Sequence, residues 1–183
     1  MQYITRKGSF DAAHRMLNER VKCFNIHGHT FLYELTFSFE QPDDLGYALD
    51  FKEIKRLPEK FIEDYFDHAY ISNPADTDTI NFIQNVAKTK LWVMSLNGIN
   101  YCNPSAENIS KELFLVISNL MDSNNIHLSK IRLYETPNCW VECDKNCITL
   151  NECNNFNHKN GKIISEFKEK MGSFEYDDRK LKK

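Results

Sequence analysis

The chain has 183 residues, of which 42% are hydrophobic, and its formal net charge is -3. This length favours one domain with a sizeable core, and the apolar content excludes a disordered chain. The negative charge argues against a nucleic-acid partner, because proteins that bind phosphate backbones present a positive field. The sequence has neither a signal-peptide core nor an apolar run that could span a bilayer, so we expect a cytoplasmic protein with no membrane partner.

The first predicted elements are two neighbouring strands. Between Phe31 and Glu40, large apolar residues occupy every second position, so one face of a strand is buried and the other is mostly wet. The residues from Gln2 to His14 are rich in Tyr, Ile, Thr and Phe, which favours a second strand joined to the first by a loop over 15–26. A sheet with one buried face is typical of antiparallel pairing.

Three helices are predicted after these strands. The first covers about 51–65, with a kink or a shifted start at Pro58. The second begins at about 78, carries an apolar stripe as far as Met94, and ends at Asn97-Gly98. The third begins after Ser105, a candidate N-cap, and its buried stripe recurs at helical spacing.

Two more strands complete the predicted domain. They cover Ser129–Glu135, where apolar and polar residues alternate, and Cys139–Cys143. The order of two strands, helices and two strands predicts an α+β fold, with an antiparallel sheet and helices on one face. We assign residues 1–150 to this domain and residues 151–183 to a polar C-terminal extension, in which a modest helix could form around 163–171 before a basic end.

Three histidines are candidate zinc ligands. His27 and His29 are two residues apart at the start of a strand, so both imidazoles can face one ion, and His14 closes the preceding strand beside them. Three neutral imidazoles with a fourth position open to water or substrate are typical of a catalytic zinc site. The alternative from spacing alone is that each histidine is an ordinary polar residue at a strand end.

Cys23 adds chemistry to this predicted centre. It lies in the loop between the histidines, where a nearby cation would raise the thiolate fraction and make it a base or nucleophile. Alternatively, Cys23 is a fourth zinc ligand that closes a structural site.

Six segments of the chain form an ordered set: Phe10-Asp11-Ala12-Ala13-His14, Cys23-Phe24-Asn25-Ile26-His27-Gly28-His29, Leu49-Asp50-Phe51, Asp67-His68, Pro104-Ser105-Ala106-Glu107-Asn108 and Tyr134-Glu135-Thr136. In this order they resemble the signature segments of the 6-pyruvoyl-tetrahydropterin synthase family, and the resemblance covers roughly Tyr3 to Cys143. The short gap between Cys23 and His27 is similar to that of the 6-carboxy-tetrahydropterin synthase branch of queuosine biosynthesis.

The resemblance implies a tunnelling fold and a homo-oligomer, commonly a hexamer of two stacked trimers whose sheets close into barrels with shared active sites. It also implies a zinc-dependent lyase that converts dihydroneopterin triphosphate to 6-carboxy-tetrahydropterin and releases acetaldehyde and triphosphate. The residue roles that it implies are zinc binding by His14, His27 and His29, proton abstraction by Cys23, a proton relay by Asp67 and His68, and pterin binding by Glu135, with Glu107 assisting.

Alternatives to these roles follow from the residues themselves. Asp67-His68 could be the polar end of a helix, Glu135 a surface carboxylate, and Glu107 a charge that favours a helix N-terminus. A pyruvoyl-type pterin enzyme is the nearest alternative function. A non-catalytic zinc protein with a binding partner is an alternative of another class.

Two segments exceed the compact core of the family. We expect the residues at about 69–103 to be a surface insertion near the pocket. The second segment is the tail, which with the preceding strand holds four cysteines: Cys139, Cys143, Cys147 and Cys153. Their spacing lacks the paired knuckles of zinc ribbons, so buried reduced thiols are favoured over a second metal site.

Overall fold

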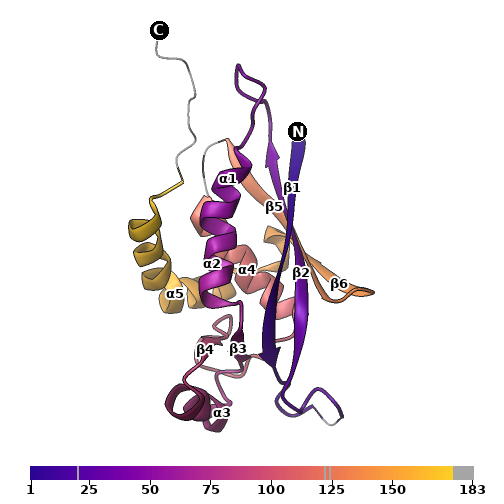
Figure 1. Cartoon of the computed structure of the whole chain (residues 1–183), viewed down its shortest axis with the longest axis vertical. Coiled ribbons are helices and arrows are strands. Elements are labelled where there is room, and N and C mark those ends of the chain that lie inside the picture. The colour runs from indigo at the N-terminus through magenta and orange to yellow at the C-terminus, as the bar shows by residue number, and fades with distance from the viewer. Residues whose placement is uncertain (20, 122, 124, 175–183) are drawn as a thin grey trace.

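The computed structural model describes residues 1–19, 21–121, 123 and 125–174. They form a six-stranded sheet in the order β4-β3-β1-β2-β5-β6, with helices packed on one face (Figure 1). The strands are β1 (Gln2–His14), β2 (His27–Phe39), β3 (Ala69–Ser72), β4 (Lys90–Val93), β5 (Ile126–Thr136) and β6 (Cys139–Cys143). The helical segments are α1 (Phe51–Ile54), η1 (Lys55–Glu59), α2 (Lys60–Tyr65), α3 (Thr77–Phe82), η2 (Ile83–Ala87), α4 (Ala106–Met121), η3 (Lys145–Cys147) and α5 (Leu150–Met171).

The hairpin of β1 and β2 is the longest part of the sheet and confirms the alternation read from the sequence. Its two strands pair antiparallel from Gln2 opposite Phe39 to His14 opposite His27. The alternate apolar residues of β2 are all buried, and Phe31 stacks on Phe10 of β1 with ring centroids 5.2 Å apart. Each large side chain removed from water in this way stabilises the fold by about 1.5–3 kcal/mol.

The first and third predicted helices are confirmed. The segment from Phe51 to Tyr65 is helical throughout, and Pro58 lies in a π turn between α1 and α2 that accommodates the missing N–H. The side chain of Ser105 accepts a hydrogen bond from the Asn108 N–H at 3.4 Å, as an N-cap does at the start of α4.

The second predicted helix is wrong beyond Ala87. The helical segment of α3 and η2 ends there, because Lys88 takes a left-handed conformation with φ of 53°. The next residues form β4, which pairs parallel with β3, while β3 pairs parallel with β1. The sheet is therefore mixed rather than antiparallel throughout, and the 69–103 segment contributes two of its strands.

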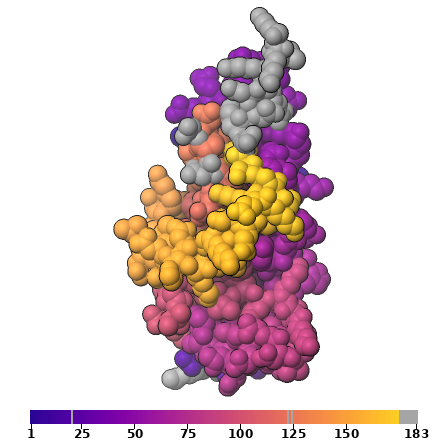
Figure 2. Space-filling view, turned by 90° about the vertical axis from the view of Figure 1, so that its left-hand side faces the viewer, coloured from indigo at the N-terminus to yellow at the C-terminus, as the bar shows by residue number. Residues whose placement is uncertain are grey.

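The C-terminal helix is longer than predicted. It begins at Leu150, after a capping box in which Thr149 and Glu152 satisfy each other's backbone N–H groups. Phe156, Ile164 and Phe167 are buried against the core, and α5 crosses the helical face of the molecule (Figure 2). None of the described helices combines the length and apolar character needed to cross a bilayer. The basic end of the predicted extension lies outside the described residues.

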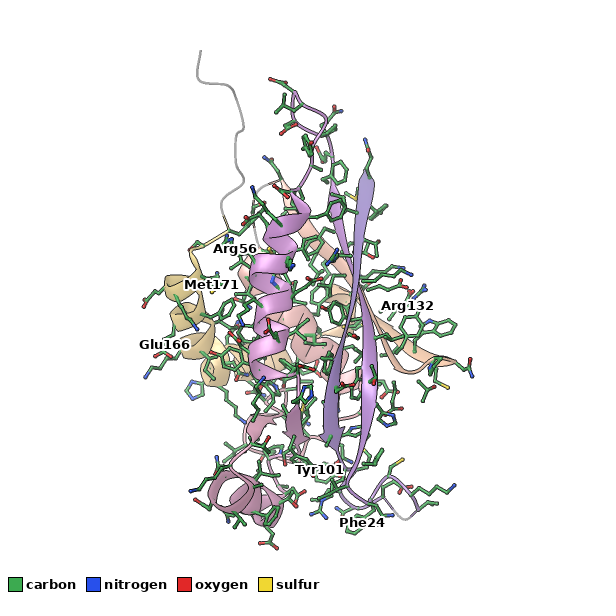
Figure 3. The ribbon with its side chains drawn as sticks, in the orientation of Figure 1. Phe24, Arg56, Tyr101, Arg132, Glu166 and Met171 are labelled. Carbon is green, nitrogen blue, oxygen red and sulfur yellow. The ribbon has the colours of Figure 1, made fainter. Side chains whose placement is uncertain are left out.

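Arg56 of η1 binds the C-terminal end of α5. Its guanidinium pairs with Glu53 and donates hydrogen bonds to the carbonyl oxygens of Met171 and Gly172 (Figure 3). A cation at the last carbonyls of a helix also complements the negative end of its dipole. The C-terminal helix is therefore bound at its end as well as through its apolar face.

A buried carboxylate joins α4 to β4 and α5. Glu112 is 0% exposed, and its oxygens accept hydrogen bonds from the Ser95 N–H at 2.6 Å, the Ser95 hydroxyl at 2.8 Å and the Trp92 indole at 3.2 Å. The Asn160 amide of α5 donates to the same hydroxyl at 2.9 Å. Burial raises the pKa of Glu112, so the group depends on these donors.

We expect Glu112→Ala to lower the free energy of unfolding by roughly 3 kcal/mol, because it leaves buried donors without an acceptor and opens a cavity. Urea denaturation followed by circular dichroism measures the change. Glu107→Ala is the matched control, since Glu107 is exposed on the same helix and should change stability by less than about 0.5 kcal/mol. Equally small effects of both variants would contradict the role given to Glu112.

Candidate metal centre

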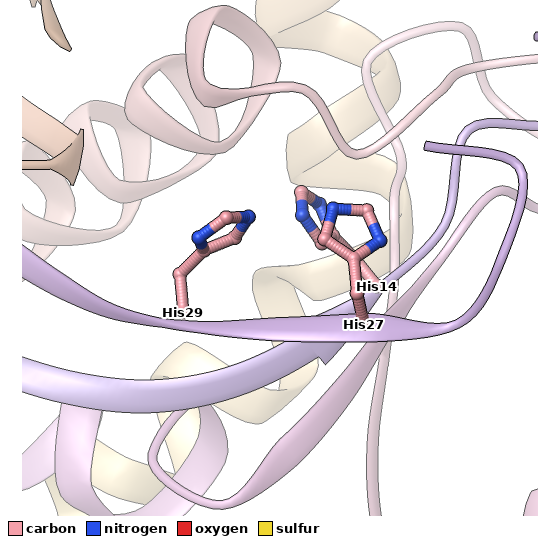
Figure 4. Close-up of side chains that lie close together, drawn as sticks. All are labelled: His14, His27 and His29. Atoms are coloured by element: carbon pink, nitrogen blue, oxygen red, sulfur yellow. The ribbon is translucent and has the colours of Figure 1, made fainter. Parts of the chain in front are cut away.

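His14, His27 and His29 lie together on the helix-covered face of the hairpin (Figure 4). His14 pairs with His27 across the two strands, and His29 pairs with Ala12, so the three side chains point to the same side of the sheet. Their ring centroids are 4.6–5.3 Å apart, and one ligand atom from each lies within 4.8 Å of the others. The structure thus brings together the three histidines that the sequence singled out.

Backbone carbonyls fix the tautomers of two of these rings. Nδ1 of His14 lies 2.7 Å from the Pro104 carbonyl oxygen, and Nδ1 of His27 lies 2.8 Å from that of Asn25. A carbonyl oxygen can only accept, so each Nδ1 carries the proton and each Nε2 keeps a free lone pair. Metal-binding histidines are commonly oriented in this way by a hydrogen bond from the other ring nitrogen.

The lone pairs have no partner within the described part of the chain. Nε2 of His14 and Nε2 of His29 are buried and make no hydrogen bond there. Because His14 is 0% exposed, burial lowers the pKa of its imidazole to about 4, so the ring is neutral near pH 7. The neutral imidazole of His14 and the unpaired Nε2 atoms of His14 and His29 fit the donor set of a zinc ion.

Glu135 lies beside this centre. Its carboxylate oxygen Oε1 is 3.7 Å from Nε2 of His14 and 3.8 Å from Nε2 of His29, and its side chain is one-third exposed. It therefore faces both the histidines and solvent. Glu107, by contrast, is exposed in the first turn of α4 and is not part of the histidine group.

The Asp67-His68 pair lies on the other side of the hairpin. Nδ1 of His68 is 2.8 Å from Asp67, whose other oxygen accepts from the Asp11 N–H at 2.9 Å. The pair groups with the carboxylate of Asp11, which is hydrogen-bonded to Thr30 at 2.6 Å. Asp11 and Thr30 alternate with the positions of the histidines, so they occupy the opposite face. Within one chain the pair and the metal centre are separated by the sheet.

Cys23 is exposed in the loop between the strands and does not belong to the histidine group. Its carbonyl oxygen accepts a hydrogen bond from the Met16 N–H at 2.7 Å, which closes the loop on itself. Cys23 therefore does not act as a fourth ligand in the described arrangement, in which the carboxylate of Glu135 is the acidic group next to the three imidazoles.

The other cysteines only partly match the prediction of buried thiols. Cys143 is buried and Cys153 is partly buried, but Cys139 and Cys147 are exposed. Cys139 is the first residue of β6 and lies opposite Thr136, next to the turn that joins the two strands. Within the described ranges, these four residues form no group of candidate metal ligands.

Two contributors to the site have no sequence signature. The carbonyl oxygens of Asn25 and Pro104 orient the imidazoles, but every residue type carries a carbonyl, and only the fold brings Pro104 to His14. Asp11 is different, because its place three residues before His14 already put it on the opposite face of a strand. This odd spacing from His14 was the sequence feature that could have indicated the cluster of Asp11, Asp67 and His68 on the opposite face.

The buried neutral state of His14 predicts how the stability of the metal-free protein depends on pH. Between pH 6.5 and about 4 the unfolded chain takes up a proton at this residue and the folded chain does not. We therefore expect His14 to reduce the free energy of unfolding by on the order of 3 kcal/mol across this range as the pH falls.

Denaturant titrations of the chelator-treated protein at several pH values measure this dependence. His14→Ala should remove that part of the pH dependence, whereas His158→Ala, at an exposed position of α5, should keep it. The same pH dependence in native protein and His14→Ala would refute the assignment to this imidazole.

Comparison with known proteins agrees with the geometry. The 6-pyruvoyl tetrahydropterin synthase family matches residues 3–146. A 6-carboxy-5,6,7,8-tetrahydropterin synthase of Rickettsia conorii is 37% identical over 139 residues, which cover 75% of this chain and 96% of that protein. Its counterpart in Haemophilus influenzae is 30% identical over 145 residues, which cover 76% and 96%.

A solved structure shows the same fold. The 6-pyruvoyl tetrahydropterin synthase of Caenorhabditis elegans superposes with a TM-score of 0.55 over 78% of this chain and 94% of that one, at 21% identity. The resemblance of the six sequence segments is thereby confirmed, together with the kind of enzyme that it implied. The chain is a lyase of the 6-pyruvoyl tetrahydropterin synthase family.

Proposed function

We propose that the protein converts 7,8-dihydroneopterin triphosphate to 6-carboxy-5,6,7,8-tetrahydropterin, with release of acetaldehyde and triphosphate, as a step of queuosine biosynthesis. The observation that carries the proposal is the set of three converging imidazoles, one buried and two partly buried, with the carboxylate of Glu135 beside them. The names of the Rickettsia and Haemophilus relatives support the carboxy product. A pyruvoyl-type reaction on the same scaffold is the alternative.

His14, His27 and His29 would hold a zinc ion. Bound there, the ion would supply Lewis acidity toward the hydroxyl groups of the substrate side chain. The chain's part is to keep the three Nε2 lone pairs available: the Pro104 and Asn25 carbonyls hold two rings in the required tautomer, and burial keeps His14 neutral.

Glu135 and Cys23 would act on the two ends of the substrate. A carboxylate has two oxygens that match the paired N–H donors of a 2-amino-4-oxo pterin, and Glu135 presents them next to the histidines. Cys23, as a thiolate, would remove a proton from a side-chain carbon. The exposed position of Cys23 in a loop leaves it accessible to a substrate bound at Glu135. Glu107, in the first turn of α4, would assist pterin binding.

Asp67 and His68 would form the proton relay, and the geometry favours a relay that serves a neighbouring subunit. Asp67 accepts from Nδ1 of His68, which leaves Nε2 free to exchange a proton with substrate. The side chain of His68 is 74% exposed on the face that the histidines of its own chain do not share. His68 also lies beside β1 at Asp11, next to the stretch of that strand that β3 does not pair, so a second copy joined at this edge could bring its metal centre to the relay.

The open edges of the sheet support a homo-oligomer. On one side of the sheet β6 pairs only with β5 among the described strands. On the other side the short β3 reaches only Ala12–His14 of β1, so the residues Gln2–Lys7 of β1 pair only with β2. Exposed edges of this kind are normally paired or protected. We propose that copies join edge to edge into the barrel of a tunnelling fold, as a hexamer of two trimers.

The face that would line such a barrel is polar. It carries the ion pairs of Lys7 with Glu34 and of Arg132 with Glu142, and Trp140 lies over the Arg132 guanidinium at 5.5 Å. Arg132 lies on the side of the hairpin away from the helices (Figure 3). Charged side chains here suit a water-filled interior better than a dry interface. We also propose a cytoplasmic location, which agrees with the six free cysteines of the structure.

The product of the reaction tests the proposed function directly. Purified zinc-loaded protein incubated with 7,8-dihydroneopterin triphosphate should release acetaldehyde and form 6-carboxy-tetrahydropterin, which liquid chromatography with mass spectrometry identifies. Cys23→Ala should retain about one zinc per chain and lose at least a hundredfold in turnover, because the base is absent but the ligands remain. Pyruvoyl product without acetaldehyde would select the pyruvoyl reaction. Loss of zinc from Cys23→Ala would support a closed structural site.

Mixed oligomers test whether the relay acts between chains. Cys23→Ala and His68→Ala proteins should each be nearly inactive, whereas oligomers reassembled from equal amounts should recover about a quarter of native activity, since a quarter of randomly paired sites contain both intact groups. A mixture of Cys23→Ala with Glu135→Gln is the control, because both changes belong to the same chain's half of the site. If the first mixture stays inactive, the relay does not act between chains.

A further inference from the structure

The loop that carries Cys23 runs between two of the metal-centre histidines. Among its described residues, 15–19 and 21–26, the backbone hydrogen bonds within the loop are Met16 N–H to Cys23 at 2.7 Å, Glu19 N–H to Met16 at 3.3 Å and Asn25 N–H to Lys22 at 3.1 Å. These bonds fold the loop on itself, and Cys23 is exposed. Contacts from other parts of the chain are therefore needed to place the thiol relative to the histidines.

Asn103 holds the first half of this loop. Its amide oxygen accepts from the Leu17 N–H at 2.9 Å, and its amide nitrogen donates to the Leu17 carbonyl oxygen at 3.2 Å. The same amide donates to the Tyr101 hydroxyl at 2.8 Å and accepts from Asn73 at 2.8 Å, so all of its hydrogen-bonding capacity is used. Tyr101 also donates to the Leu17 carbonyl oxygen.

Asp76 holds the loop through Arg15. Its carboxylate pairs with Nε and Nη2 of Arg15 at 2.7 and 2.6 Å, and it is only 4% exposed. The Arg15 guanidinium also lies 5.2 Å from the ring centroid of Phe24, the residue next to Cys23. Phe24 and Tyr101 both lie at the loop end of the hairpin (Figure 3). A bidentate pair with a buried carboxylate fixes the orientation of Arg15 as well as its position.

The segment that holds the loop also touches the metal centre. Pro104, the residue after Asn103, supplies the carbonyl oxygen that orients His14. The Asn108 amide donates to the Asn103 carbonyl oxygen at 2.9 Å, which connects this dipeptide to the first turn of α4. One rigid stretch of chain thus contacts both the loop of Cys23 and a candidate zinc ligand.

We infer that Asn103 and Asp76 are positioning residues, which hold the Cys23 loop in a fixed place relative to the three histidines. The inference rests on the proposed function only in giving Cys23 the role of base. The inference also gives Arg15, a basic residue near the site, a structural role. The Arg15 guanidinium pairs with Asp76 rather than with a phosphate group of the substrate. The loop is ordered by polar contacts from 73–103, not by the hairpin alone.

Two variants and a control test the inference. Asn103→Ala removes both hydrogen bonds to Leu17, and Asp76→Asn removes the charge that holds Arg15 while keeping the side-chain volume. Asn155→Ala is the matched control, because Asn155 makes a similar amide hydrogen bond, to the Leu96 carbonyl oxygen at 2.8 Å, from α5. Thermal melting confirms that each variant is folded.

Hydrogen–deuterium exchange of the peptide covering 15–24 is the direct measurement. Exchange should become about tenfold faster in Asn103→Ala and in Asp76→Asn, the effect of losing about one ordinary hydrogen bond, and should be unchanged in Asn155→Ala. Bound zinc should remain at about one per chain. Unchanged exchange in both loop variants would overturn the inference, whether or not the native protein acts on a pterin.

Steady-state kinetics distinguish two possible roles of the loop, which are to place the catalytic base and to bind the substrate. With native turnover established, kcat should fall at least tenfold in both loop variants with KM within about twofold, since the loop places a group that acts in the transition state. An increase in KM with native kcat would show that the loop binds substrate instead, and would overturn the role given to Cys23 placement. Absence of native turnover would count against the proposed function alone, because the exchange result still decides how the loop is held.

Discussion

The register of the β1–β2 hairpin is the constraint on which the site depends. Because side chains alternate along a strand, pairing His14 with His27 and Ala12 with His29 places three imidazoles on the covered face. A slip of one residue in either strand would move that strand's histidines to the opposite face and expose its aromatic residues. The same aromatic residues that form the core, Phe10 and Phe31 among them, therefore also fix the candidate metal centre.

Close approach of the two strands at the histidines needs a residue without a side chain. A Cβ added at Gly28 would lie 3.1 Å from the Ala12 carbonyl oxygen, tighter than such contacts normally are. Gly28 stands between His27 and His29, so the two imidazoles can point inward while the backbone between them packs against β1. The alternation that places the histidines inward also places Asp11 and Thr30 outward, where they join the Asp67-His68 pair. The hairpin thus carries one group of polar side chains on each face, and this geometry supports the proposal of a site shared between copies.

The sequence predicted correctly those elements in which buried residues recur at the spacing of a strand or a helix. The β2 alternation and the stripe of α4 are long, and each position repeats the same signal. The stretch Lys90–Val93 could not be read in this way, because Leu91 and Met94 continue the helical stripe of Ile83 and Ala87. What ends the helix is the left-handed backbone of Lys88, and what makes the strand is a partner, β3, that is only four residues long and wholly buried. Such short parallel strands carry no periodicity of their own.

The site was predictable to the extent that its chemistry resides in side chains. His14, His27 and His29 could be named from residue type and spacing, because the chain has only six histidines, whereas Glu135 was named from the family resemblance. The structure brings the four together. The groups that orient the imidazoles and the Cys23 loop are backbone carbonyls and amide side chains, which are common throughout any sequence. Their roles depend on contacts between residues far apart in the chain, such as Pro104 with His14 and Asn103 with Leu17.

Through such distant contacts the 69–103 segment connects the helical layer to the loop that carries Cys23. At Ser95 it is fixed by the buried carboxylate of Glu112 and by Asn160 of α5, and at Asn103 it fixes the loop that carries Cys23. A segment anchored to the helical layer at one end can hold a loop at the other, because packed elements move as units rather than deform continuously. The helical layer therefore does more than cover the sheet: through this segment it provides the rigid frame in which a thiol and three histidines keep a constant relation.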